Sequence, residues 1–170
     1  NANINNADNP SSFYFLNLLS GTVSNGDSSV IDVIVDMGSR VSGIYSDSIV
    51  ISSNAPATPE VVIPLTINYI GAPEIALSDT CMDLGSVMQY LSGSQTLTLY
   101  NTGCNTLTVT DINNSLSVFT VDDTAMTILP GNSAVVNVTF SPVSSGTFLD
   151  TLTIINDDVN KTVCLTGRGF

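Results

Sequence analysis

The sequence lacks histidine and tryptophan altogether, and its only basic residues are Arg40, Lys161 and Arg168. Without histidine, most metal sites and most general-base chemistry lose their usual residue. Asp and Glu number fifteen, so the formal net charge is −12, and such a surface repels phosphate groups. We therefore expect no nucleic-acid partner and no catalytic activity.

Long apolar runs are also missing. No stretch reaches the roughly eighteen consecutive apolar residues of a membrane helix, so we expect no direct membrane insertion. Charged residues make up only 11% of the chain, which leaves Ser, Thr and Asn as the main polar surface residues. That composition is commoner in extracellular β proteins than in cytosolic enzymes. Hydrophobic residues make up 43%, enough for a real core.

What the sequence does contain is a succession of short β-strand patterns. Alternating β-branched residues recur every ten or so positions between clusters of Gly, Asn, Asp and Ser, and no segment has a helical period. The clearest predicted strand is Ser29 to Met37. One of its faces is apolar throughout and consists of Ile31, Val33, Val35 and Met37. The pattern predicts an all-β sandwich.

An internal repeat divides the chain. Three segments of the first part align with three of the second: Gly26–Val33 with Gly131–Val138, Ser42–Ile51 with Ser145–Ile154, and Ile63–Thr66 with Val163–Thr166. The spacing changes only across turns, where length differences are tolerated. We infer two copies of one module.

The two copies differ in length. The second runs from 73 to 170 and carries predicted strands from Pro73 through Ile112 before the shared region begins. The first copy, 1–72, has no visible counterpart for these strands and begins with a polar leader, 1–12. The sequence thus predicts a complete module preceded by the C-terminal half of another.

The second copy resembles a known family through five ordered motifs: Leu84–Val87, Gln95–Gly103, Leu129–Ser133, Val138–Pro142 and Leu165–Gly169. Their order and spacing resemble the ASPM-SPD-2-Hydin (ASH) type of immunoglobulin-like module, which is related to the major-sperm-protein fold. The resemblance implies tandem immunoglobulin-like β-sandwiches, the first one incomplete. It also implies a role in spacing, assembly or protein contact, with no catalytic residues, as in bacterial secreted and cell-surface proteins.

The three cysteines lack the spacing of a zinc site. If the strands that follow Cys81 and precede Cys104 pair as a hairpin, both thiols fall near one end of the sandwich. We therefore weigh a Cys81–Cys104 disulfide against unpaired thiols. Cys164 lies within the last strand and is interpreted as a small buried hydrophobe.

Two kinds of loop site have a structural alternative. Asp122, Asp123, Asp157 and Asp158 could bind calcium, but Asp also begins turns by capping backbone N–H groups, and this second interpretation is the stronger. We expect no other cofactor. Possible glycosylation sites are Ser48, Thr124 and Thr151 in Asp-Ser/Thr-apolar triplets, and Asn113, Asn137 and Asn160 in Asn-x-Ser/Thr sequons. Shared descent of a strand start, or chance in an Asn- and Thr-rich chain, explains them equally.

Three roles remain open. The first is a structural module of a bacterial extracellular filament or adhesin-like surface protein. Its half module then has three open explanations: truncation of a longer chain, proteolysis of the parent, or completion by β-strand addition from other copies or neighbouring modules of the parent chain. In the last case the face of Ile31, Val33, Val35 and Met37 is covered from outside. The second is an accessory spacer or carbohydrate-binding module of a secreted enzyme. The third is an intracellular scaffold, against which a disulfide would count.

Overall fold

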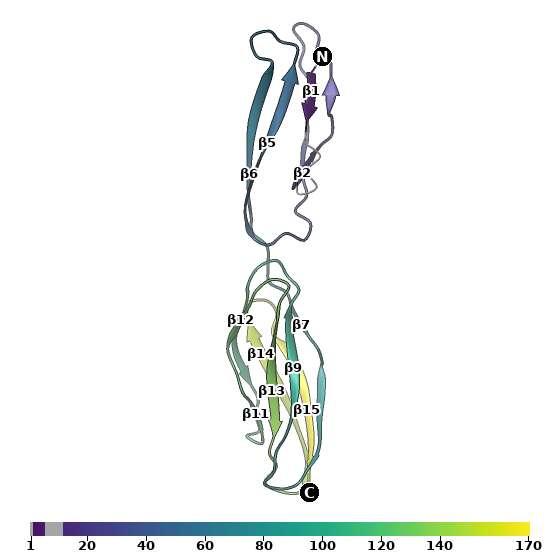
Figure 1. Ribbon diagram of the computed structural model, residues 1–170. Coiled ribbons are helices and arrows are strands. Elements are labelled where there is room, and N and C mark those ends of the chain that lie inside the picture. The colour runs from purple at the N-terminus through teal and green to yellow at the C-terminus, as the bar shows by residue number, and fades with distance from the viewer. Residues whose placement is uncertain (1, 6–11) are drawn as a thin grey trace. The chain divides into compact units, whose positions relative to one another are not determined.

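The computed structural model describes the backbone of residues 2–5 and all of residues 12–170. Its regular structure is β-strand throughout (Figure 1). Two compact units divide the chain, Asn1–Ile70 and Gly71–Phe170, called here the first and second unit. No helix long and apolar enough to span a membrane occurs in the described part of the chain.

The second unit is a sandwich of two sheets. Its strands are β7 (Ile75–Leu77), β8 (Cys81–Val87), β9 (Gly93–Asn101), β10 (Leu107–Asn113), β11 (Phe119–Val121), β12 (Met126–Ile128), β13 (Ser133–Phe140), β14 (Gly146–Asn156) and β15 (Lys161–Gly169). One sheet has the order β12-β10-β14-β15-β8 and the other β11-β13-β9-β7. All pairings are antiparallel except that of β15 with β8.

The core of the second unit follows from strict alternation along its strands. On β13, Val136, Val138 and Phe140 are 0% exposed, while the residues between them face outward. Leu97 and Leu99 of the neighbouring β9 enter the same core. Burying each such side chain contributes about 1.5–3 kcal/mol relative to exposure.

The first unit is smaller and has fewer strands. They are β1 (Ala2–Asn5), β2 (Tyr14–Leu16), β3 (Ser20–Gly21), β4 (Val33–Val35), β5 (Gly43–Ser53) and β6 (Glu60–Tyr69). One sheet has the order β3-β1-β5-β6, and β2 pairs with β4 in the other. Its buried core consists of Phe13, Tyr14, Leu16 and Ile49, with half-buried residues packed around them.

Strands β1 to β6 reproduce the pairings of β10 to β15. The registers match at two places: Tyr14 opposite Val35 as Phe119 opposite Phe140, and Ile4 opposite Ile51 as Ile112 opposite Ile154. The expected polar leader is therefore wrong for Ala2–Asn5, which pairs with β5 along its whole length. The remainder of that leader, apart from Ser12, lies outside the described residues.

The sequence predicted that the first unit lacks counterparts of all strands from Pro73 through Ile112, and this prediction included one strand too many. Among its described residues the first unit shows no counterparts of β7, β8 and β9, and β1 stands in the place of β10. A segment as short and polar as Ala2–Asn5 shows no strand pattern of its own. Its pairing with β5 makes it a strand, since tertiary context overrides local preference in sheets.

The predicted strand from Ser29 to Met37 is reduced to Val33–Val35. In the second unit, the equivalent β13 extends over eight residues, and all of them pair with β9. In the first unit β4 has β2 as its neighbour, and that pairing covers three residues. A strand needs a neighbour for its backbone groups, and β4 is short where the described residues give it no second neighbour.

Candidate assembly surface

Apolar side chains of the first unit are exposed where their counterparts in the second unit are buried. Val33 is 40% exposed and Val35 is 41% exposed, although both lie opposite buried residues of β2 and therefore face the core side. Their equivalents, Val138 and Phe140, are 0% exposed. Val33 and Val35 face the same side of their sheet as Val138 and Phe140. Their larger exposed fraction therefore comes from weaker cover over the sheet.

The last strand of the first unit gives a second example. Ile63 is 44% exposed, whereas the equivalent Val163 is 0% exposed. In the second unit Met82 and Leu84 of β8 belong to the same core as Val163. Among the residues described for the first unit, no counterparts of β8 and β9 lie beside Val33, Val35 and Ile63. We call these three side chains the uncovered face.

Of the four residues predicted as an assembly face, Val33 and Val35 belong to this uncovered face. Ile31 and Met37 are half-buried and pack against the small core of the first unit. The predicted set therefore divides into two inner contacts and two exposed positions. Whether a partner covers them stays a prediction.

Polar side chains link segments of the first unit that are distant in sequence. The Tyr14 hydroxyl donates to the carbonyl of Ser48 at 3.0 Å, and burial, followed by the charge of Asp47, raises the pKa of Tyr14. The Arg40 guanidinium donates to the carbonyl of Ser12 at 3.2 Å and lies 5.9 Å from the centroid of the Tyr45 ring. The Tyr14 bond ties β2 to β5, and Arg40 ties the segment before β5 to the one before β2.

The disulfide of the second unit joins Cys81 and Cys164, whose Cα atoms are 4.4 Å apart. The predicted Cys81–Cys104 bridge is therefore wrong, as is the interpretation of Cys164 as a hydrophobe. The prediction was wrong because it assumed that β8 and β9 form a hairpin within one sheet. Strand β8 does not pair with β9 but lies in the other sheet, parallel to β15, where Cys81 stands opposite Cys164. Cys104 keeps its thiol, 3.8 Å from the carbonyl oxygen of Ala72.

The four calcium candidates accept hydrogen bonds from the backbone. Asp122 accepts from Asn137 N at 2.8 Å and Asp123 from Ala125 N at 3.2 Å. Asp157 accepts from Thr108 N at 2.8 Å, and Asp158 from Ile75 N at 3.0 Å. No group of three or more potential ligands occurs among the described residues. Only Asp123 caps a turn, since its donor lies two residues along the chain, whereas the other three carboxylates accept from strands distant in sequence.

Asp150 is a structural carboxylate that sequence patterns did not single out by itself. It accepts from the N–H groups of Ser115 and Leu116 and from the Asn114 side chain, at 2.7–3.1 Å for its Oδ2. Desolvation, the largest single influence, raises the pKa of Asp150, but four hydrogen bonds together outweigh it and lower the pKa. The carboxylate thus fixes the loop after β10 to β14.

The glycosylation candidates are mostly accessible. Asn113, Thr124, Asn137, Thr151 and Asn160 are exposed, and Ser48 is half-buried. All three Asn side chains are already engaged: Asn113 donates to Asp111 at 2.9 Å, Asn137 donates to Asp122 at 2.6 Å, and Asn160 accepts from Asn156 N at 3.2 Å. Modification at these positions stays a prediction.

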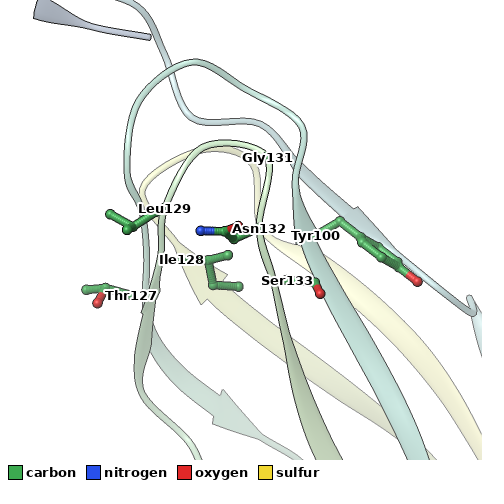
Figure 2. A pocket seen from close by; sticks show the side chains of 7 residues that line it. All are labelled: Tyr100, Thr127, Ile128, Leu129, Gly131, Asn132 and Ser133. Atoms are coloured by element: carbon green, nitrogen blue, oxygen red, sulfur yellow. The ribbon is translucent and has the colours of Figure 1, made fainter.

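A depression of about 570 Å³ lies at one end of the second unit, beside the turn between β12 and β13 (Figure 2). It is lined by Tyr100, Thr127, Ile128, Leu129, Gly131, Asn132 and Ser133. Gly131 has a φ of 74°, the left-handed conformation that this turn requires. The lining contains no charged side chain, and the ring of Tyr100 points away from Ile128.

Comparison with known families places the second unit. The family described as "HYDIN/CFA65/VesB-like, Ig-like domain" matches residues 73–169. The chain belongs to this family. The HYDIN/CFA65/VesB-like match confirms the resemblance to an ASH-type immunoglobulin-like module and the all-β sandwich fold, and it supports a structural or accessory role. No curated protein sequence matches the chain closely.

Solved structures share this HYDIN/CFA65/VesB-like fold at low sequence identity. One is the ASH / PapD-like domain 7 of human CEP192, with 10% identity and a TM-score of 0.53, covering 56% of this chain and 84% of that one. Another is a protein of unknown function from Porphyromonas gingivalis W83, with 14% identity and a TM-score of 0.52. It covers 98% of this chain and 84% of that chain. At such identities the likeness is one of fold alone.

Proposed function

We propose that the chain is a structural module of a bacterial extracellular filament or adhesin-like surface protein, without catalytic activity. Its first unit is completed by β-strands from other copies or from neighbouring modules of the parent chain. The observation that carries the proposal is the uncovered face: Val33, Val35 and Ile63 are 40–44% exposed at positions whose counterparts in the second unit are fully buried. Exposed apolar patches of this kind mark sites of association.

Export is supported by the disulfide and by the surface composition. A Cys81–Cys164 bridge persists in oxidising compartments and is rare in the cytosol, which counts against an intracellular scaffold. The net charge of −12 keeps a secreted chain away from anionic surfaces. We propose a location on the bacterial cell surface or outside the cell.

Self-association is the direct test. The purified chain is expected to form dimers or longer assemblies in a concentration-dependent way, measured by light scattering after size-exclusion chromatography and by negative-stain electron microscopy. Val33→Asp with Val35→Asp should abolish them. Val135→Asp is a matched control, because Val135 is 56% exposed on the outer face of β13. A chain that stays monomeric up to millimolar concentration would contradict assembly between copies.

A second candidate is an accessory carbohydrate-binding module or spacer of a secreted enzyme. The observation that favours it is exposed aromatic surface: Tyr90 is 81% exposed, and Tyr100 is 41% exposed beside the uncharged depression of Figure 2, with its ring directed outward. Aromatic rings offer an apolar body with a polar tip. Retardation in polysaccharide-containing gels, lost on Tyr90→Ala or Tyr100→Ala, would support this role. Migration equal to that of an inert protein would exclude it.

A further inference from the structure

We propose that the disulfide between Cys81 and Cys164 is a redox-operated latch on strand β8. When a dithiol reductant cleaves the bond, β8 separates from β15 while the other strands of the second unit keep their pairing. The inference concerns the second unit alone and does not rest on the proposed function.

The disulfide lies on the outer face of its sheet. Burial alternates along both strands, so Met82 of β8 and Val163 and Leu165 of β15 are buried toward the core. The two cysteines occupy the intervening, outward positions, where Cys81 is exposed and Cys164 half-buried. Exposed disulfides are accessible to thiolates and are the labile or regulatory ones. The more exposed residue, Cys81, is the expected point of attack.

The reaction is ordinary thiol–disulfide exchange. A thiolate of the reductant attacks Sγ of Cys81, the bond between the two sulfur atoms breaks, and Cys164 leaves as a thiolate that takes up a proton. The second thiol of the reductant then attacks the mixed disulfide and releases Cys81 as a thiol. Two electrons pass to the protein, and the reductant leaves as its own disulfide.

Apart from this bond, β8 is held from one side. It ends the sheet order β12-β10-β14-β15-β8, so β15 is its hydrogen-bonded neighbour in the described part of the chain. The pairing is parallel, which is slightly less stable per residue than antiparallel pairing. A bulge also interrupts it, because Leu84 and Gly85 together stand opposite Gly167, and Gly85 has a φ of 76°.

The other contacts of β8 are few. Met82 and Leu84 are its buried side chains. Gln95 Nε2 donates to the carbonyl of Asp83 at 2.7 Å, and Thr166 Oγ1 donates to the Asp83 carboxylate at 3.3 Å, both in exposed positions. Strand β15, by contrast, pairs with β14 along its whole length. Local opening is therefore expected at β8 rather than at β15.

Opening changes what the sheet presents to its surroundings. Cys164 N loses its bond to the carbonyl of Thr80, 3.0 Å long in the closed form, and the outer edge of β15 becomes unpaired. Val163 and Leu165, 0% and 1% exposed in the closed form, lose the cover of Met82 and Leu84. The reduced unit thus displays an apolar strand edge that the oxidised unit hides.

Amide hydrogen exchange on the full chain tests the latch. It is measured before and after addition of dithiothreitol, without denaturant, in a Cys104→Ser background that removes the third thiol. We expect exchange within residues 81–87 and at Cys164 to accelerate at least several-fold, while β9 and β13 keep their protection. Unchanged exchange within residues 81–87 would overturn the latch. Equal acceleration in β13 would show that the unit opens as a whole and would overturn the local opening.

Two further measurements sharpen the test. Cys81→Ser with Cys164→Ser should reproduce the reduced pattern without reductant and should not respond to dithiothreitol. A response in that variant would show that the effect does not pass through this disulfide. Exchange with glutathione, quenched by acid, should trap the mixed disulfide at Cys81, and a predominant adduct at Cys164 would overturn the point of attack. Self-association of the oxidised chain is measured separately, so the latch and the proposed function can each fail alone.

Discussion

Asn17 and Asp32 hold each other through two hydrogen bonds: Asp32 N donates to Asn17 Oδ1 at 2.9 Å, and Asn17 Nδ2 donates to Asp32 Oδ2 at 2.6 Å. The second unit has the same pair with the side chains exchanged. There, Asn137 N and Nδ2 donate to the carboxylate of Asp122 at 2.8 and 2.6 Å. The two modules therefore preserve a contact between strands while the negative charge moves from one strand to the other.

The Asp122 contact predicts a pH dependence. Hydrogen bonds from the Asn137 side chain and backbone lower the pKa of Asp122. A carboxyl whose pKa is lowered on folding stabilises the protein above its ordinary pKa of about 3.9, and this stability is lost as pH falls through the lowered value. We expect Asp122→Asn and Asn137→Ala each to flatten the acid-side fall in the melting temperature, measured from pH 7 to pH 2. A slope equal to that of the unaltered chain in both variants would contradict this role.

Reduction of the disulfide should destabilise the second unit selectively. Cys81 and Cys164 are separated by 83 positions, and in the chain-entropy description a loop of that order contributes about 4.5 kcal/mol. We expect urea unfolding of the second unit at markedly lower denaturant after reduction, followed by hydrogen exchange resolved by residue. Cys104→Ser is the matched control and should leave the midpoint within error, whereas an equal shift in that variant would refute the assignment.

Equivalent valines should respond differently to truncation. Val138→Ala removes two methyl groups from a closed core and should cost about 2 kcal/mol of unfolding free energy. Val33→Ala, at the same place in the first unit but 40% exposed, should cost less than about 1 kcal/mol. Denaturant titrations of both variants provide the comparison. Comparable losses would mean that Val33 is already covered in the purified chain.

Gly167 should not tolerate a larger side chain. A Cβ added there would lie 2.7 Å from two ring carbons of Phe140, whose ring is fully buried and stacks on Phe119 at 4.9 Å. Overpacking of this kind costs about 1–3 kcal/mol. Gly167→Ala is expected to lower the melting temperature, while Gly43→Ala, whose nearest neighbour would be 3.8 Å away, should have little effect. Unchanged stability of Gly167→Ala would show that Phe140 can move aside.

Much of the fold could be predicted from the repeat, since alternating residues such as Val136 and Val138 indicate both the strand and its buried face. The strand Ala2–Asn5 escaped prediction because register with β5, and not its own hydropathy, makes it a strand. The cysteine pairing failed for a related reason. Adjacent strands in sequence suggest a hairpin, but β8 crosses to the other sheet, and sheet membership is a long-range property.

The position of the uncovered face was partly predictable. The pattern of Ile31, Val33, Val35 and Met37 identified the inner side of β4, but not which members the remaining strands already cover. Which members are covered depends on β2 and on what lies at the other edge of β4, and the sequence of β4 alone indicates neither. The exposure of Ile63 was not predicted. Its counterpart Val163 on β15 is covered by β8, a strand distant in sequence. The repeat alignment indicates this cover only when the pairing of β8 with β15 is known.

The crosslink between Cys81 and Cys164 has a mechanical consequence. The two ends of the second unit, Gly71 and Phe170, lie just outside the segment that the bond encloses. A tension applied along the chain passes through the sulfur atoms and bypasses the 82 residues between them, so pulling can extend only the short flanks. In a surface protein exposed to shear, such a module would transmit force as a nearly inextensible link while its neighbour, without cysteine, yields first.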